Sequence, residues 1–236
     1  MKNILTLTFK ELRSYFTSPV AYVVFVIFLI LSGYFFSAIL FVSREASLTG
    51  VAYNIIITLL FLTPLITMKL FAEEKKLGTL EILMTKPVKD FEVVLGKFLA
   101  AVSLFGIMLL STLVYVLILF KYGNPDSGPI ISSYIGIFLC GISFIAIGIF
   151  ASTLTENQII SAVIGFSSIL LLWILNWLSG YVGEGLQDLL NYLALSAHLD
   201  DFIKGVIDLK DVIYYLSFVI LWLFVSIKSI EIRKWR

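Results

Sequence analysis

The sequence predicts an all-α polytopic membrane protein. Hydrophobic residues make up 60% of the chain, charged residues only 14%, and the mean hydropathy is +1.02. A chain of 236 residues needs more charge than this to cover a water-soluble globule. The hydrophobicity is concentrated in runs without Asp, Glu, Lys or Arg, and runs such as FVIFLILSGYFF are apolar at every phase. The absence of apolar–polar alternation favours helices over β-barrel strands.

Six transmembrane helices follow from the lengths of these runs. A bilayer core of about 30 Å needs about 20 apolar residues in a helix, and five runs reach this length outright. The sixth reaches it if Lys228 extends its ammonium group to the interface, as lysine side chains commonly do. We expect the spans at about residues 20–42, 51–70, 98–120, 130–154, 159–180 and 212–230.

Residues 2–17 predict an interfacial amphipathic helix that lies on the membrane surface. Apolar residues recur there at helical spacing, and polar side chains occupy the opposite stripe. The apolar stripe consists of Leu5, Phe9, Leu12 and Phe16. A plainer interpretation is a basic leader that only orients the first span. Ser18-Pro19 should end this helix, because proline disfavours a helical residue before it and suits the first turn of a new helix.

The positive charges predict which side of the membrane each segment faces. If both termini lie on one side, that side carries all of the 17 Lys and Arg residues except Arg44, Lys121, Lys204 and Lys210. Loops rich in Lys and Arg stay in the cytoplasm. We therefore expect a multi-pass protein of the inner (cytoplasmic) membrane with both termini, and the charged segment 71–97, on the cytoplasmic side.

The opposite side should carry one long segment, residues 181–211. Leucines recur in it at helical spacing: Leu186, Leu189, Leu190 and Leu193. We expect one or two short amphipathic helices on the outer leaflet. Acidic residues predominate here, which motivates the hypothesis of an auxiliary protein bound at the outer face. His198 lies in this segment without a partner nucleophile, so we expect it to be structural.

The composition argues against catalysis by this chain. The apolar runs hold no Asp, Glu, Lys or Arg, and polar residues inside them, such as Asn54, are more often packing or cavity-lining groups. A single cysteine, Cys140, and a single histidine make a disulfide framework or a metal site improbable. A phosphate loop around Gly96-Lys97 would need glycine at position 91 and Ser or Thr at position 98, and phenylalanine stands at both. We expect no catalytic residue, cofactor or nucleic-acid partner.

The charged segment 71–97 predicts a helix of about three turns, an elbow at Lys86-Pro87, and a second helix capped by Asp90. Its first helix has an apolar stripe made of Leu77, Leu80, Leu83 and Met84. Gly78 weakens that helix, either because another surface approaches closely or because the chain bends there. One interpretation is a lever that docks a soluble partner. The other is a charged loop that only holds two spans apart.

A family resemblance favours the first interpretation. The run AEEKKLGTLEIL at residues 72–83, followed by KPV and VLGKF, resembles the cytoplasmic signature of ABC-2 type permease subunits of ATP-binding-cassette exporters. It is most similar to permeases of the gliding-motility and nitrous-oxide-reductase-maturation type. The KEL and SP motifs near the start and the residues around His198-Leu199 and Asp208 also match, so the resemblance covers essentially the whole chain.

The resemblance implies a six-helix permease that dimerises with an identical or related permease and is driven by two cytoplasmic ABC ATPase subunits, which would bind ATP and Mg. It places a coupling helix at about residues 73–85 and a second ATPase contact at residues 155–158. The implied docking residues are Glu73, Glu74, Gly78, Thr79, Leu80, Glu81, Leu83, Glu156 and Asn157.

Two alternatives remain open from the sequence. The same ATP-driven movement could do mechanical work on an outer-face protein without any transport. Alternatively, the chain could act alone as an ion-coupled carrier or an intramembrane enzyme, although carriers usually bury carboxylates along their pathway and these spans have none.

Overall fold

The computed structural model describes residues 2–43, 47–84 and 88–233, and in these ranges the chain forms helices and no strand. Their order along the chain is α1 (Lys2–Thr17), α2 (Pro19–Ser43), α3 (Thr49–Thr67), α4 (Lys69–Lys76), α5 (Thr79–Met84), α6 (Asp90–Ser111), α7 (Leu113–Tyr122), α8 (Ser127–Leu154), α9 (Gln158–Ser179), α10 (Glu184–Leu193), α11 (Asp200–Ile203) and α12 (Leu209–Arg233).

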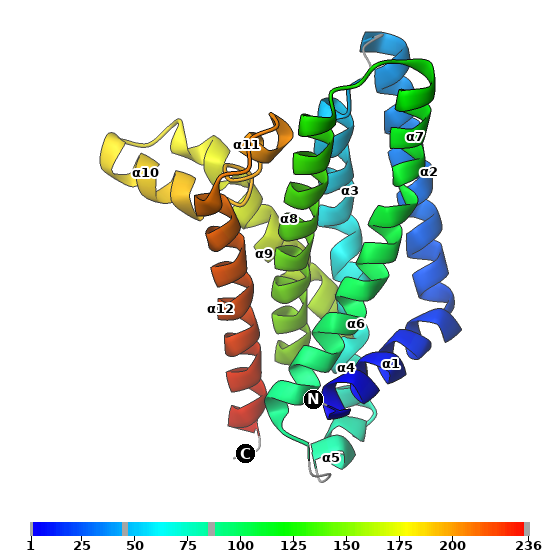
Figure 1. Ribbon diagram of the computed structural model, residues 1–236. Coiled ribbons are helices and arrows are strands. Elements are labelled where there is room, and N and C mark those ends of the chain that lie inside the picture. Colours follow the sequence, from blue (N-terminus) through cyan, green and yellow to red (C-terminus); the bar gives the residue numbers. More distant parts are fainter. Residues whose placement is uncertain (1, 44–46, 85–87, 234–236) are drawn as a thin grey trace.

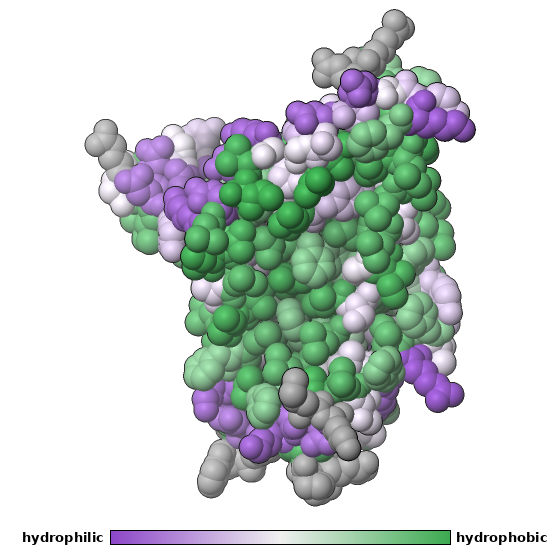
Figure 2. Space-filling model, viewed as in Figure 1, coloured by the Kyte–Doolittle hydropathy of each residue, from purple (hydrophilic) through white to green (hydrophobic). Residues whose placement is uncertain are grey.

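Six of the described helical segments are long and apolar enough to cross a membrane. They are α2, α3 with α4, α6 with α7, α8, α9 and α12. Figure 1 shows them side by side as a bundle, and Figure 2 shows a broad apolar band with hydrophilic residues at both ends. The prediction of an all-α membrane protein with six spans is confirmed. We call the end of the bundle that holds α1, α4, α5 and both termini the lower end, as drawn in Figure 1, and the opposite end the upper end.

Helix α8 is the centre of the bundle. It packs against α3, α6, α9 and α12, and 83% of its apolar window is buried, compared with 22% for α2 and 17% for α9. Small residues allow the close approach. A Cβ atom added at Gly141 would lie 2.3 Å from the Phe105 ring of α6, and one at Gly148 would lie 2.1 Å from Thr67 Oγ1 of α3.

Two spans are broken, and the sequence analysis did not predict either break. Span two changes from α3 to α4 at Met68, four residues after Pro64. Span three changes from α6 to α7 at Thr112, whose hydroxyl donates to the Leu109 carbonyl over 2.7 Å. Hydroxyls that bond back to the helix backbone commonly bend a helix, so Thr112 accounts for the second break.

Helix α1 crosses the lower end of the bundle and turns into α2 at Ser18-Pro19 (Figure 1). Leu7 and Tyr15 pack into the core, but part of the apolar surface of α1 faces away from the bundle. Leu5 and Phe9 point outward and are 57% and 68% exposed, whereas Thr8 and Glu11 are buried against the bundle. An outward apolar stripe suits a helix that lies in the headgroup layer.

At the upper end, α10 projects sideways from the bundle (Figure 1). Its leucines Leu186, Leu189 and Leu193 are exposed, in keeping with the predicted amphipathic helix. The chain then returns through residues 194–199 and the short α11 to α12. The hydroxyl of Tyr53 donates to Asp200 Oδ1 over 2.5 Å, which ties α11 to the upper part of α3.

Candidate functional site

The predicted lever at the lower end consists of two short helices instead of one. Helix α4 ends at Lys76, and α5 begins at Thr79. Between them Gly78 has a φ of +68°, in the left-handed region that glycine adopts without strain. The single three-turn helix predicted over Glu73 to Thr85 is therefore wrong. A Cβ atom at Gly78 would meet nothing within 4 Å, so the bend explains this glycine, and close packing within the chain does not.

The two helices expose only some of the predicted docking residues. Glu73, Thr79 and Glu81 are exposed, Glu74 and Gly78 are half-buried, and Leu80 is buried. The predicted apolar stripe is split: Leu77 is 66% exposed and Leu80 is 3% exposed. The side chain of Leu83 and residue Thr85 lie outside the described part of the chain. The exposed face of the lever is thus Leu77 surrounded by charged and polar groups.

The second helix of the charged segment also begins differently from the prediction. Lys89, not Asp90, is the residue that precedes the first turn of α6. The Glu92 carboxylate accepts the Lys89 backbone N–H over 3.0 Å and closes that first turn. The Asn3 side chain also donates to Glu92, over 3.2 Å, so the start of α6 is held to the start of α1.

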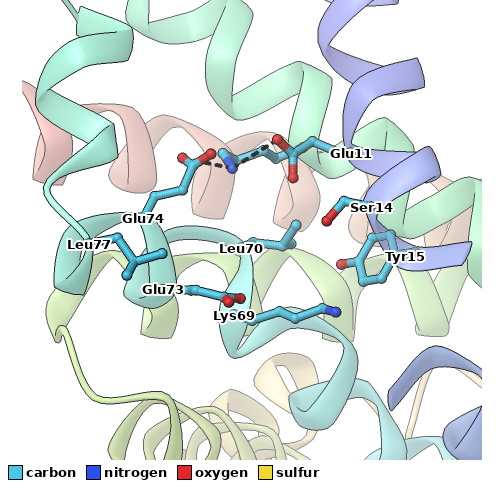
Figure 3. Close-up of a pocket in the computed structure, with 9 residues that line it drawn as sticks. Glu11, Ser14, Tyr15, Lys69, Leu70, Glu73, Glu74 and Leu77 are labelled. Atoms are coloured by element: carbon cyan, nitrogen blue, oxygen red, sulfur yellow. Dashed lines mark ion pairs between the residues drawn. The ribbon is translucent and has the colours of Figure 1, made fainter. Parts of the chain in front are cut away.

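An ionic cluster fixes the lever to α1 and α6 (Figure 3). Lys97 of α6 lies 2.9 Å from Glu74 of α4 and 3.3 Å from Glu11 of α1. Lys10 of α1 lies 3.2 Å from Glu11 and 3.3 Å from Glu74, so it bridges the same two carboxylates. We call these four residues the lower ionic cluster. Its two positive and two negative side chains link α1 to α4 and α6, which lie more than fifty residues further along the chain.

Burial makes this cluster more than a set of surface ion pairs. Lys97 is 1% exposed, and its ammonium group lies 5.1 Å from the centre of the Phe71 ring. Lys10 is on the outside of the cluster. Burial lowers the pKa of Lys10, but the Glu11 and Glu74 carboxylates outweigh this and the net pKa is raised. The Lys10 ammonium group therefore stays charged throughout the physiological pH range.

A small cavity lies beside the lower ionic cluster, between α1 and α4. It is lined by Glu11, Ser14, Tyr15, Lys69, Leu70, Glu73, Glu74, Leu77 and Lys97 (Figure 3). Its volume of about 140 Å³ is below the 300–1,000 Å³ typical of small-molecule sites. The cavity therefore leaves space for side-chain movement at the lever and is too small for a typical ligand.

The break between α3 and α4 is closed by side chains from two other helices. Ser152 of α8 accepts the backbone N–H groups of Phe71 and Ala72 over 2.9 and 3.1 Å, and its hydroxyl donates to the Met68 carbonyl over 3.1 Å. Tyr15 of α1 donates to the Ile66 carbonyl over 2.9 Å. Polar backbone groups freed by the break are thus paired, which keeps α4 in one position relative to the bundle.

The predicted second contact, the turn between α8 and α9, adjoins the lever. Lys75 of α4 donates to the Thr153 carbonyl, two residues before the turn, and the Thr153 hydroxyl reaches Ser229 of α12 over 3.0 Å. Asn157 caps α9 by accepting the Ile159 N–H over 2.9 Å, and both Glu156 and Asn157 are exposed. The structure therefore brings the two predicted docking segments together at one surface.

The sequence analysis did not assign Glu11, Lys97, Ser152 or Tyr15 to this site. Lys97 carried a usable signal, because a lysine two turns inside an apolar helix must find a partner. Glu11 lies in the KEL motif of the resemblance, but nothing in the sequence indicated its partners, and Ser152 and Tyr15 offered no signal because a serine or tyrosine near a span end is common. Among the described residues, no group of three or more His, Cys, Asp or Glu side chains could hold a metal ion.

Comparison with known protein families identifies the class of this chain. The model of the ABC-2 family transporter proteins matches residues 43–227. The chain belongs to the ABC-2 family. The resemblance inferred from the 72–83 motif is thereby confirmed at the level of the family, and the narrower gliding-motility subtype stays a prediction. A search of curated proteins found no match. The part matched to ABC-2 transporters contains the lever and the α8–α9 turn and leaves out α1.

Proposed function

We propose that this ABC-2 protein is the permease subunit of an ATP-driven exporter and that a cytoplasmic ABC ATPase, which binds the ATP and Mg, docks at the lower end. The observation that carries the proposal is the contact between Lys75 and Thr153. This contact joins the α4–α5 lever to the α8–α9 turn as one surface. Ser152 and the lower ionic cluster attach that surface to the membrane spans. A charged loop that only separates two spans would need none of these contacts.

The lower end is the cytoplasmic end in this proposal. It carries both termini and the charged segment 71–97, and Lys and Arg residues are concentrated there. The positive-inside rule places such an end in the cytoplasm of an inner-membrane protein. An ATPase there would meet the exposed Glu73, Leu77, Thr79 and Glu81 of the lever and the exposed Glu156 and Asn157 of the turn.

The contacts also supply a route for movement. A shift of α4 would act directly on α3, because the two helices form one span with a break at Met68. The same shift would act on α6 and α1 through the lower ionic cluster and on α8 through Ser152. Docking at one small surface would therefore move at least four helices as a unit.

A second permease subunit, identical or related, would pack on α3 and α9. Their exposed stripes adjoin, since the rings of Phe61 and Phe166 lie 5.1 Å apart, and Ile57 and Leu171 are 45% and 61% exposed on them. Ser167 lies exposed in the middle of the α9 stripe. A hydroxyl at this depth is better accommodated by a partner helix or a polar pathway than by lipid.

Copurification tests the docking surface. Leu77→Asp and Glu81→Arg change exposed side chains, so the chain should still insert and fold, and we expect each to abolish recovery of an ABC ATPase from native membranes in mild detergent. Val206→Asp, which places the same charge on an exposed upper-end residue, is the matched control. Undiminished recovery of the ATPase with both lever variants would contradict docking at this surface.

A mechanical role is the second candidate, and one observation favours it. Helix α3 continues into the lever at its lower end and is bonded to α11 at its upper end through Tyr53 and Asp200. Movement at the lever could therefore reach an auxiliary protein at the outer face. Crosslinking from residues 184–211 in intact cells would capture such a protein. Transport by the purified chain in liposomes without any ATPase would contradict both candidates and establish a stand-alone carrier.

A further inference from the structure

The upper end contains a buried acid–base pair that the proposed coupling does not use. His198, the single histidine of the sequence, and Asp211 are 5% and 4% exposed. His198 Nδ1 lies 2.5 Å from Asp211 Oδ1, and His198 Nε2 lies 3.0 Å from the backbone carbonyl oxygen of Tyr192. Both ring nitrogens thus face an oxygen atom at hydrogen-bond distance.

The two partners fix the number of protons in this arrangement. A backbone carbonyl can only accept, so Nε2 must carry a proton and donate it to Tyr192. A carboxylate can also only accept, so a second proton must lie between Nδ1 and Asp211, on either atom. A neutral imidazole beside an ionised Asp211 has one proton for two acceptors. One of the two contacts would then set a nitrogen lone pair against an oxygen.

These contacts hold three separate pieces of the chain together. Tyr192 is in the last turn of α10, His198 is in the segment between α10 and α11, and Asp211 is in the first turn of α12. Tyr214 of α12 stacks on the imidazole with ring centres 3.7 Å apart and donates to the Leu193 carbonyl over 2.9 Å. We call residues 184–208 the upper cap. Its closed form depends on the contacts of His198.

The surroundings of the pair are a cavity through which a proton can exchange and several aromatic rings. A cavity of about 320 Å³ adjoins the pair, and its other lining residues are Asp188, Asn191, Tyr192, Ala197, Asp201 and Lys210. Asp188 of α10 and Asp201 of α11 are acidic, and Lys210 is the one cation among these residues. The aromatic rings near the imidazole are those of Tyr192, Tyr214 and Tyr215.

We propose that His198 and Asp211 form a proton-binding latch that keeps the upper cap closed against α12 and opens it when the shared proton leaves. The state of the latch depends on the pH at the upper face. The proposal does not require that an ATPase docks at the lower end. Opening would free the end of α10 and the segment that carries His198. Closure would also preserve the Tyr53–Asp200 contact that ties the cap to α3.

Two measurements on the full chain in lipid nanodiscs test the latch. With ¹⁵N-labelled histidine and a purification tag that lacks histidine, the imidazole signals come from His198 alone. We expect Nε2 to be protonated and Nδ1 to share a proton with Asp211 in the closed form, and the shared proton to leave as the pH is raised. Hydrogen exchange of amides in residues 193–212 should accelerate by about tenfold or more over the same transition.

Substitutions separate the latch from a merely structural pair. Asp211→Asn supplies an amide N–H for Nδ1, so a neutral imidazole satisfies both contacts and cap exchange should no longer depend on pH after correction for intrinsic rates. Asp201→Asn changes another carboxyl group of the same cavity and should keep the transition. If no proton is shared between Nδ1 and Asp211 while the cap is protected, or if cap exchange depends on pH in Asp211→Asn as it does in the wild type, the proposal is wrong.

Discussion

Replacing Lys97 with methionine tests whether the lower ionic cluster holds α1 and the lever to the bundle. Methionine has a similar length and keeps an apolar contact with Phe71, but it removes the buried positive charge. Glu11 and Glu74 would then share only Lys10, which is largely exposed. We expect α1 and α4 to separate from α6 in a larger fraction of molecules.

The distances give the size of the effect. At an effective dielectric constant of about 20, opposite charges at 2.9 and 3.3 Å attract by about 5 kcal/mol each. Desolvation of a buried ammonium group offsets most of this attraction, and removing one partner of a buried pair costs about 3–5 kcal/mol. Because about 1.4 kcal/mol is a factor of ten, the population with α1 undocked should rise by about 10²- to 4 × 10³-fold.

Hydrogen exchange of the α1 amides measures this population directly. Lys76→Met is the matched control, because Lys76 is an exposed lysine of the same lever. Adding Glu74→Gln to Lys97→Met removes one of the stranded carboxylates and should recover part of the loss. Equal exchange of α1 in the Lys97→Met and Lys76→Met variants would refute the structural role of the cluster.

Three further substitutions probe the lever and its contacts. Ser152→Ala leaves two α4 backbone N–H groups without the Ser152 hydroxyl as acceptor, so we expect the free energy of unfolding to fall by about 1–3 kcal/mol, seen as a lower thermal midpoint. Ser143→Ala is the control and should change the midpoint little, because the Ser143 hydroxyl bonds within its own helix. Gly148→Ala brings a Cβ atom to 2.1 Å from Thr67 Oγ1 and should reduce the yield of folded protein. Adding Thr67→Ala should partly restore the yield. If the yield is not restored, the contact with Thr67 is not the cause of the loss. The alanine side chain of Gly78→Ala would meet no atom, but it forces an L-residue to a φ of +68°, which costs about 1–2 kcal/mol. The lever should therefore be cleaved faster by protease, and an unchanged cleavage rate would argue against the bend.

The long elements of the fold could be predicted from the sequence because each depends on a local property. Runs without charge set the six spans, Ser18-Pro19 sets the turn into α2, and the mixed charges of segment 71–97 mark the lever. The breaks at Met68 and Thr112 depend on hydrogen bonds that single residues make in the folded bundle. Such bonds leave no periodic pattern in the sequence.

The candidate site could likewise be predicted only in part. Its location followed from composition and a recognisable motif. Its internal structure did not, since Glu11, Glu74 and Lys97 are separated by more than twenty residues in each case and only folding brings them together. Leu80 illustrates the limit, because helical spacing placed it on the same stripe as Leu77, and the left-handed Gly78 turned the two side chains to opposite environments.

The outward apolar residues of α1 make the lipid a structural component of the lower end in a membrane-embedded chain. Leu5 and Phe9 are exposed where the bilayer surface would lie, and Glu11 and Lys10 of the same helix complete the lower ionic cluster. The bilayer surface and the cluster therefore hold α1 from opposite sides. A change in lipid packing or acyl-chain length around the lower end would alter the angle of α1, so under the proposed ATPase docking the movement passed to the spans would vary with the membrane in which the protein is placed.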